Sequence, residues 1–302
     1  MSKEKFDFYD PTSIRSYNLD SQIRYQLKML DGLDSFTRRH CENVASITCR
    51  LCEHLHLRKE FTVFCTTCAY LHDLGKIFIP PAILQKPSKL TDEEYAIMKT
   101  HTTIGYDMCM KDPKLRPYAS GALYHHEGLD GTGYPNGVTA KEIPYEAQII
   151  RVADEFEAIT AKRQYKTHIG IIETLNILID HARPVKPNKV GKIDPKILKA
   201  LFKVVIDDTE YEISARSDYL SYLKDEIKRL NQAQKYYYKM QNTSNEYKKE
   251  EYKFNAKYLL HENEEFEKIP TILKEIEETY VAREAHIQKL YNEVKQIKKL
   301  RI

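Results

Sequence analysis

The chain has 302 residues and a formal net charge of only +3, because 47 Lys and Arg residues face 44 Asp and Glu residues. Charge this balanced argues against a protein that follows the phosphates of a nucleic acid polymer. No apolar run approaches the roughly 18–20 residues that span a bilayer, and the charged first residues do not resemble a secretion signal. We therefore expect a cytoplasmic protein with no membrane partner and no nucleic acid partner.

Apolar residues recur at helical spacing through most of the chain up to residue 208. The clearest such segments are residues 44–55, 61–71, 149–159 and 171–178. Thr91 and Glu94 form a capping-box pattern that begins a further helix through Met98. Two loop signatures interrupt the helices: the prolines of residues 79–81 and the glycine-rich residues 128–137. No segment alternates with a period of two, so we predict an all-α fold.

The composition changes after residue 208, where the chain has no glycine, one proline and half of its 22 tyrosines. Apolar residues keep a three-four spacing over residues 223–230 and again over residues 273–297. Such a narrow stripe is typical of a coiled coil or a bundle seam. We predict a helical hairpin or a three-helix appendage, with a partly disordered tail as the alternative. The seam also suggests a homodimer through these C-terminal helices.

Seven residues of metal-binding types stand out in the first part of the chain. They are His40, His72, Asp73, His101, His125, His126 and Asp154. Imidazole and carboxylate together suit Zn, Mn or Fe. Side chains at adjacent helical positions point about 100° apart, so His72 and Asp73 can share a cavity only if it wraps the end of their helix. Asp154 lies in an apolar helix, where a buried carboxylate needs a partner cation. Each histidine taken alone is better explained as a packed or surface residue, and spacing alone leaves both interpretations open.

Longer motifs resemble a known family. The segment His72-Asp73-Leu74-Gly75-Lys76 resembles the HDxGK signature of HD-GYP domains, which belong to the HD phosphohydrolase superfamily. His125-His126-Glu127 with residues 130–135 resembles the HHE…DGxGYP segment of that family. The resemblance covers about residues 30–207. It implies an HD-type helical bundle with a C-terminal helical or coiled-coil appendage. The expected domains are an N-terminal helical segment over 1–29, an HD-GYP domain over 30–208 and a charged, tyrosine-rich tail over 209–302.

The resemblance also implies roles for individual residues. The seven residues named above align with metal ligands of the family, with Asp73 bridging two ions. Asp73 and Lys76 would be the catalytic residues. Substrate contacts would come from Lys76, Tyr134, Arg163 and Lys166. Members with a third metal carry a glutamate where this chain has Phe36. We therefore expect two divalent metal ions, iron or manganese.

The activity implied by the resemblance is hydrolysis of cyclic di-GMP. Hydroxide generated between two metal ions would attack phosphorus and give linear pGpG. A second hydrolysis of pGpG to GMP is left open. A different class of function is a signalling scaffold that binds cyclic dinucleotides with little or no turnover. Hydrolysis of another nucleotide is a third alternative. The pairs Cys49/Cys52 and Cys65/Cys68 have zinc-like spacing, but they lie on apolar helix faces, where cysteine acts as a small hydrophobic residue.

Overall fold

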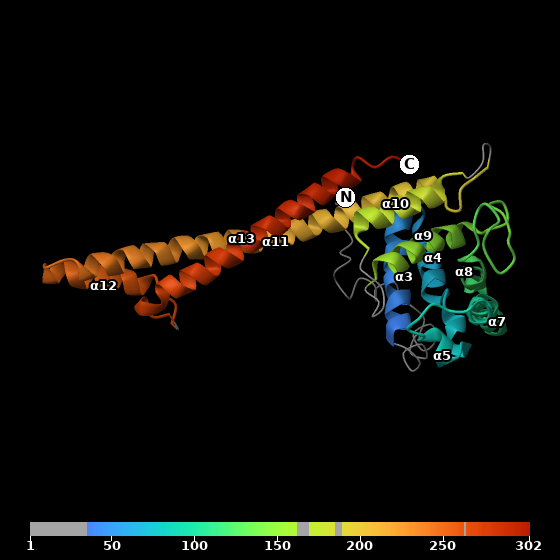
Figure 1. Cartoon of the computed structure of the whole chain (residues 1–302), viewed down its shortest axis with the longest axis horizontal. Coiled ribbons are helices and arrows are strands. Elements are labelled where there is room, and N and C mark those ends of the chain that lie inside the picture. Colours follow the sequence, from blue (N-terminus) through green and yellow to red (C-terminus); the bar gives the residue numbers. More distant parts are fainter. Residues whose placement is uncertain (1–34, 162–168, 185–188, 263) are drawn as a thin grey trace. The chain divides into compact units, whose positions relative to one another are not determined.

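The computed structural model describes residues 35–161, 169–184, 189–262 and 264–302. These residues form two compact units, one reaching to Val205 and including Leu300–Ile302, the other comprising Ile206–Lys299. Both units are helical (Figure 1), and the described ranges contain no β structure beyond one isolated bridge between Asp130 and Thr139. The prediction of an all-α fold is confirmed. The predicted helical segment over residues 1–29 lies outside the described residues, and the predicted domain bounds stay predictions.

The first unit is a bundle of helices around α4 (Lys59–Leu71). Its neighbours are α3 (Ser35–His54), α8 (Ala119–Tyr124) and α9 (Tyr145–Thr160). Small residues such as Cys41, Ala45, Cys68 and Ala153 are completely buried on the facing sides, which lets the helices pack closely. All six cysteines lie in the described ranges, where they are buried thiols outside any disulfide. Burial raises the pKa values of Cys65 and Cys68 well above the usual range, so these thiols remain neutral and apolar.

Shorter helices complete this unit. They are η1 (Leu74–Phe78), α5 (Pro81–Leu84), α6 (Asp92–Lys99), α7 (His101–Lys111), η2 (Arg116–Tyr118) and α10 (Ile171–Ala182). The predicted capping box begins α6: the Thr91 hydroxyl accepts from the Glu94 amide, and the Glu94 carboxylate accepts from the Thr91 amide at 2.8 Å. Helix α11 (Pro195–Gln241) begins in this unit and continues as the first helix of the second.

The second unit consists of the rest of α11, α12 (Glu246–Tyr258), η3 (Phe266–Lys268) and α13 (Ile269–Ile297). Two apolar clusters join α11 and α13 as an antiparallel pair. Ile213 packs with Ile287, Leu290 and Val294, and further along α11 Leu230 and Ala233 pack with Ile269 and Leu273. The predicted three-helix appendage is confirmed, and its seam is buried within one chain.

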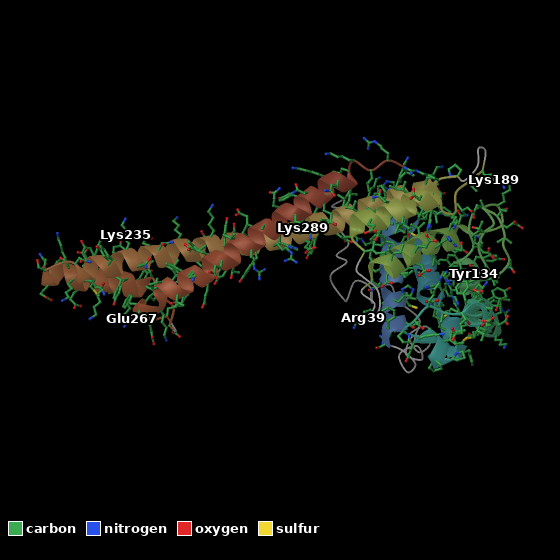
Figure 2. The ribbon with its side chains drawn as sticks, in the orientation of Figure 1. Arg39, Tyr134, Lys189, Lys235, Glu267 and Lys289 are labelled. Atoms are coloured by element: carbon green, nitrogen blue, oxygen red, sulfur yellow. The ribbon has the colours of Figure 1, made fainter. Side chains whose placement is uncertain are left out.

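Charged side chains cover the surface of the second unit. Lys235, Glu267 and Lys289 are among the exposed ones (Figure 2). Over the described residues, every helix is either too short or too polar to cross a membrane.

Candidate metal centre and its pocket

The end of helix α4 places His72 and Asp73 side by side in the interior. Helix α4 ends at Leu71, and the chain turns at Asp73 into the 3₁₀-helix η1. This change of helix type brings two adjacent side chains to one cavity, as the sequence requires. Both residues are completely buried. Nδ1 of His72 donates to the Ala69 carbonyl oxygen at 2.6 Å, and its Nε2 lies 3.3 Å from Asp73 Oδ2.

Gly75 allows this turn to lie against helix α7. A Cβ atom at residue 75 would lie 1.9 Å from the His101 carbonyl oxygen and 2.6 Å from the Gly105 nitrogen, both backbone atoms. Only glycine therefore permits the approach. The contact brings Asp73 next to His101, with 3.3 Å between Asp73 Oδ1 and His101 Nε2. The glycine of the HDxGK segment thus has a structural reason to be there.

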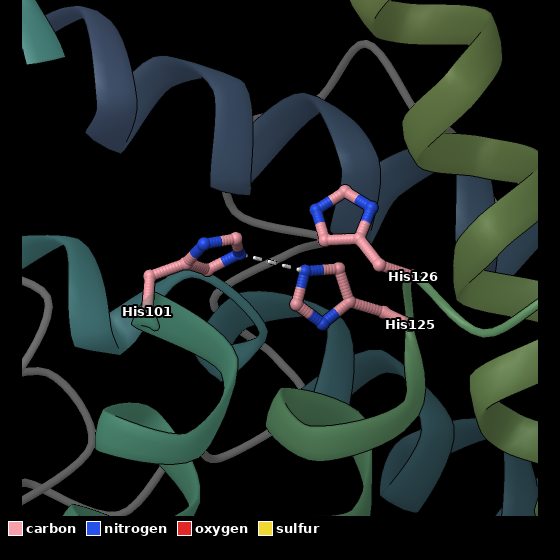
Figure 3. Close-up of side chains that lie close together, drawn as sticks. All are labelled: His101, His125 and His126. Carbon is pink, nitrogen blue, oxygen red and sulfur yellow. Dashed lines mark hydrogen bonds between the residues drawn. The ribbon is translucent and has the colours of Figure 1, made fainter. Parts of the chain in front are cut away.

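Three histidines from α7 and the end of α8 lie close together (Figure 3), and the Nε2 atoms of His101 and His125 lie 3.3 and 3.8 Å from Asp73 Oδ1. Nδ1 of His101 donates to the Met98 carbonyl at 2.6 Å, and Nδ1 of His125 lies 3.0 Å from the Gly121 and Ala122 carbonyls. A carbonyl only accepts, so both Nε2 atoms carry lone pairs. These Nε2 atoms face each other at 3.3 Å. Two lone pairs at that distance repel each other unless a cation lies between them.

All three histidines are electrically neutral. Burial lowers the pKa of His101 to about 4 and that of His126 to about 3. It also places the pKa of His125 well below the usual range. The neutral imidazole is the form that binds metal ions.

His40 lies on the other side of Asp73, between acidic residues. Its Nε2 lies 3.1 Å from Asp154 Oδ1 and 3.4 Å from Asp73 Oδ2. Burial lowers its pKa, but hydrogen bonds to Asp154 and Glu157 outweigh burial and raise the pKa to about 9. Asp154 also lies 3.9 Å from Nδ1 of His126. A continuous network of short contacts therefore joins all seven predicted ligands.

Asp73 is ionised at the centre of this network. Burial alone would raise its pKa, but the Lys76 ammonium and the imidazole of His72 keep the pKa well below the usual range. Lys76 Nζ donates to Asp73 Oδ2 at 2.5 Å. Lys76 thus places an ammonium group beside the cluster of predicted ligands.

The donor set fits a divalent metal ion. Two buried atoms, Nε2 of His72 and Oδ1 of Asp73, have no hydrogen-bond partner within the described part of the chain. An unsatisfied buried polar atom costs about 1–3 kcal/mol. Two groups of three donors, His40/His72/Asp73 and His101/His125/His126, each have their donor atoms within 4.8 Å of one another. The neutral imidazoles of the group His101/His125/His126 and the ionised carboxylate of Asp73 are ligands that suit Fe, Mn and Zn.

A pocket of about 520 Å³ opens onto this cluster. Its lining includes four of the predicted site residues, His40, His101, His126 and Lys76, and the predicted substrate residue Tyr134. The ring of Tyr134 stacks on that of His126 with 4.7 Å between centroids. The pocket is also lined by Phe36, which stands where family members with a third metal carry a glutamate. Arg163 and Lys166 lie outside the described residues.

Two buried glutamates support the site, and sequence reasoning gave neither a role. Glu157 Oε2 lies 2.5 Å from His40 Nδ1, and Glu157 Oε1 accepts from Asn43 at 3.0 Å. Glu127 Oε1 accepts from the amides of Asn136 and Gly137 at 2.6 and 3.1 Å, which holds the glycine-rich loop against the histidine pair. A signal for Glu157 existed: it lies three residues after Asp154, on the same side of the helix.

The comparisons with known proteins agree with this geometry. A family model described as an HD domain matches residues 25–188. The cyclic di-GMP phosphodiesterase of Thermotoga maritima is 44% identical over 179 residues, which is 59% of this chain and 47% of the relative. A 3'3'-cGAMP-specific phosphodiesterase (number 3) of Vibrio cholerae is 34% identical over 178 residues, or 59% of this chain and 37% of the relative. The chain thus spans about half, or less, of the length of these curated relatives.

Among solved structures, an HDG"Y"P protein from Bdellovibrio bacteriovorus aligns with a TM-score of 0.46 at 21% identity, covering 66% of each chain. The family model covers more than half of this chain, and its range includes all seven predicted ligands. The chain therefore belongs to the HD domain family, of the HD-GYP type that its motifs predict.

Proposed function

We propose that this chain is a metal-dependent phosphodiesterase that opens a cyclic dinucleotide, with cyclic di-GMP as its substrate. The observation that carries the proposal is a cluster of five histidines and two aspartates that faces a pocket together with Lys76; all seven are buried except His126, whose side chain is 26% exposed. Relatives named as cyclic di-GMP and 3'3'-cGAMP phosphodiesterases support this substrate class.

Two divalent ions, iron or manganese, are the proposed cofactors. His40 and His72 with Asp154 would hold one, and His101, His125 and His126 the other. Asp73 is suited to bridge them, since its Oδ2 faces His40 and His72 while its Oδ1 faces His101. When bound, such cations offset phosphate charge and make water a stronger nucleophile near neutral pH. The presence of Phe36 in place of a further carboxylate supports a count of two.

Lys76 is proposed to neutralise the charge that builds up on the phosphate. Burial lowers its pKa, but the Asp73 carboxylate outweighs burial and raises the pKa above the usual value. Lys76 therefore stays cationic next to the ligand cluster. An ammonium group there can hold a phosphate oxygen as the bond order changes. The stacked rings of His126 and Tyr134 offer a flat wall for a base or ribose. Arg163 and Lys166 keep their proposed substrate contacts on sequence grounds alone.

The proposed reaction adds one water to one phosphodiester. The water oxygen bonds to phosphorus, the bond from phosphorus to the ribose 3′ oxygen breaks, and a proton from the water passes to that leaving oxygen. The ring opens to linear pGpG, and a second hydrolysis would give GMP.

The experiment is metal analysis and product chromatography on one preparation of the full chain. Protein reconstituted with Mn²⁺ or Fe²⁺ is incubated with cyclic di-GMP, 3'3'-cGAMP and cyclic di-AMP. We expect about two bound metal ions, linear pGpG as the first product, and loss of turnover in His72→Ala. Intact cyclic di-GMP after incubation with metal-loaded protein would contradict the proposal.

The same experiment separates the alternatives. Tight binding of cyclic di-GMP without product would favour the scaffold function. Preferential cleavage of another cyclic dinucleotide would revise the substrate. A third bound metal ion would contradict the role given to Phe36.

The homodimer through the C-terminal helices and the cytoplasmic location also stay proposals. Within the chain, the apolar seam of α13 is already buried against α11, so a dimer would have to use other faces. Exposed aromatic residues at one side of α12, Tyr247, Phe254 and Tyr258, offer such a face. Light scattering on the full chain and on a chain ending at residue 208 tests it. We expect the full chain to be a dimer and the chain ending at residue 208 to be a monomer. A truncated chain that is still a dimer would contradict the proposal.

A further inference from the structure

Arg151 lines the pocket but has no place in the metal cluster or in the family motifs. It lies on helix α9, three residues before Asp154, so both side chains leave the helix on the same side. The side chain is only 13% exposed. Its Nε atom is buried and has no hydrogen-bond partner among the residues that the structure describes.

A chain of contacts fixes the guanidinium group of Arg151. One of its terminal nitrogens, Nη2, donates to Glu155 Oε1 at 2.6 Å. The other oxygen of Glu155 lies 2.9 Å from Nδ1 of His181, on helix α10. A simple surface pair along a helix would leave the arginine exposed and all its donors in water. Here the arginine is held in place by Glu155 while its buried Nε atom has no partner in the described part of the chain, which is the state of a preorganised binding group.

Lys192 provides a second cation at the same pocket. Its backbone is tied on both sides: its amide donates to the His181 carbonyl at 2.7 Å, and its carbonyl accepts from the Leu129 amide at 3.0 Å. Leu129 belongs to the glycine-rich loop, and His181 also contacts Glu155. The backbone that carries Lys192 is therefore held in part by His181, whose side chain contacts Glu155, the partner of Arg151.

The positive charges of Arg151 and Lys192 suit an anion other than the one that Lys76 would bind at the ligand cluster. Lys76 is paired with Asp73 at the ligand cluster, so it serves the phosphate that is cut. The two positive charges of Arg151 and Lys192 and the negative charge of Glu155 sum to one net positive charge. A cyclic dinucleotide has two phosphodiesters, each with one negative charge. We propose, given the phosphodiesterase function above, that Arg151 and Lys192 bind the phosphodiester of the cyclic dinucleotide that is not cut.

Binding to metal-free protein tests this proposal without turnover. Calorimetry with cyclic di-GMP is carried out on the full chain after treatment with a chelator. We expect Arg151→Gln to weaken binding about tenfold or more, the loss of a charge-assisted hydrogen bond to phosphate. Arg151→Lys should recover part of that loss, and Lys192→Gln should weaken binding less. The matched control is Arg183→Gln, which removes an exposed arginine paired with Asp180 outside the pocket and should bind as the unmodified protein does.

A one-phosphate substrate separates this subsite from the metal centre. Bis(4-nitrophenyl) phosphate has one phosphodiester and no second anion. In metal-loaded Arg151→Gln, kcat/KM for cyclic di-GMP should fall at least tenfold more than kcat/KM for bis(4-nitrophenyl) phosphate, mainly through KM. Equal losses on the two substrates would mean general damage to the centre and would overturn the proposal.

The remaining outcomes are also decisive. Unchanged affinity of Arg151→Gln for cyclic di-GMP would overturn the proposal while leaving the phosphodiesterase function intact. Arginine also binds the paired O6 and N7 acceptors of guanine, whereas adenine has an amino group in place of O6. A loss confined to cyclic di-GMP, with cyclic di-AMP bound as before, would assign Arg151 to a base and overturn the phosphate assignment. Unmodified protein that binds cyclic di-GMP through Arg151 but does not cut it would contradict the proposed function alone.

Discussion

Two clusters of histidine and carboxylate residues differ sharply within this chain. In the first unit, Asp73 and the histidines around it are buried, and two donor atoms lack partners in the described structure. In the second unit, Glu226, His261 and Glu264 also bring three donors together. There, however, Arg229 donates to both glutamates at 2.7 Å, and His261 is largely exposed.

The contrast shows that residue types alone do not define a metal site. Arg229 supplies the positive charge that the glutamates need, so a metal ion would first have to displace it. The first cluster has Lys76 on one oxygen of Asp73 only, and its neutral imidazoles point lone pairs at one another. An unmet electrostatic demand in a buried position, rather than the number of ligands, indicates the metal centre.

The largest expected effect is that of Asp73→Asn. This change removes the charge that faces both groups of histidines, so bound metal and turnover of cyclic di-GMP should fall to background. Metal analysis by mass spectrometry and product chromatography measure both. The control is Glu264→Gln in the second cluster, which should leave metal content and turnover as they are. Metal loss in the control would contradict the contrast between the clusters.

Metal removal should lower thermal stability. A ligand at about one hundred times its dissociation constant stabilises the folded state by about 2.7 kcal/mol, which corresponds to roughly 5–10 °C for a domain of this size. Thermal unfolding with Mn²⁺ and with a chelator measures the shift. Asp73→Asn should show no shift. A shift of equal size in that variant would place the stabilising metal ion elsewhere.

A smaller effect is expected for Glu157→Gln. Glu157 contacts Nδ1 of His40, and carboxylates that orient a ligand histidine typically contribute 10–100-fold to metal affinity or activity. Titration with Mn²⁺ should therefore show affinity lowered by about that factor. Glu42→Gln is the control, because Glu42 lies on the same helix as His40 but pairs with Arg38 at the surface. Unchanged metal affinity in Glu157→Gln would remove Glu157 from the site.

The smallest effect is expected for Arg229→Met. Loss of Arg229 leaves the carboxylates of Glu226 and Glu264 without their shared partner, although both side chains are only 14% exposed. The free energy of unfolding should fall by about 1–2 kcal/mol, while turnover stays the same. Chemical denaturation monitored by circular dichroism gives the first quantity. A gain of a tightly bound metal ion in this variant would show that only Arg229 keeps the second cluster from being a metal site.

The sequence predicted a large part of this protein, because its signals are local. Helical periodicity and the capping box at Thr91 predict the helices, since each depends on residues within one or two turns. The motifs at residues 72–76 and 125–135 predict the family and four of the proposed ligands, His72, Asp73, His125 and His126, through the resemblance they carry. The three-four spacing of the tail predicts its helices, but it does not say that the seam of α13 is buried against α11 of the same chain.

Tertiary structure decided which residues support the site. Glu157 meets His40 across 117 positions of sequence, because α3 packs against α9, and no local pattern marks that pairing. Arg151 has the form of an ordinary helical partner of Glu155, and only the fold places it in the pocket with Lys192. The second cluster shows the opposite case: its residue types resemble a metal site, and only the fold reveals that Arg229 already pairs with its two glutamates. The sequence alone determines which ligand types are present. Whether those side chains are buried, and whether their charges have partners, is decided only when distant helices pack together.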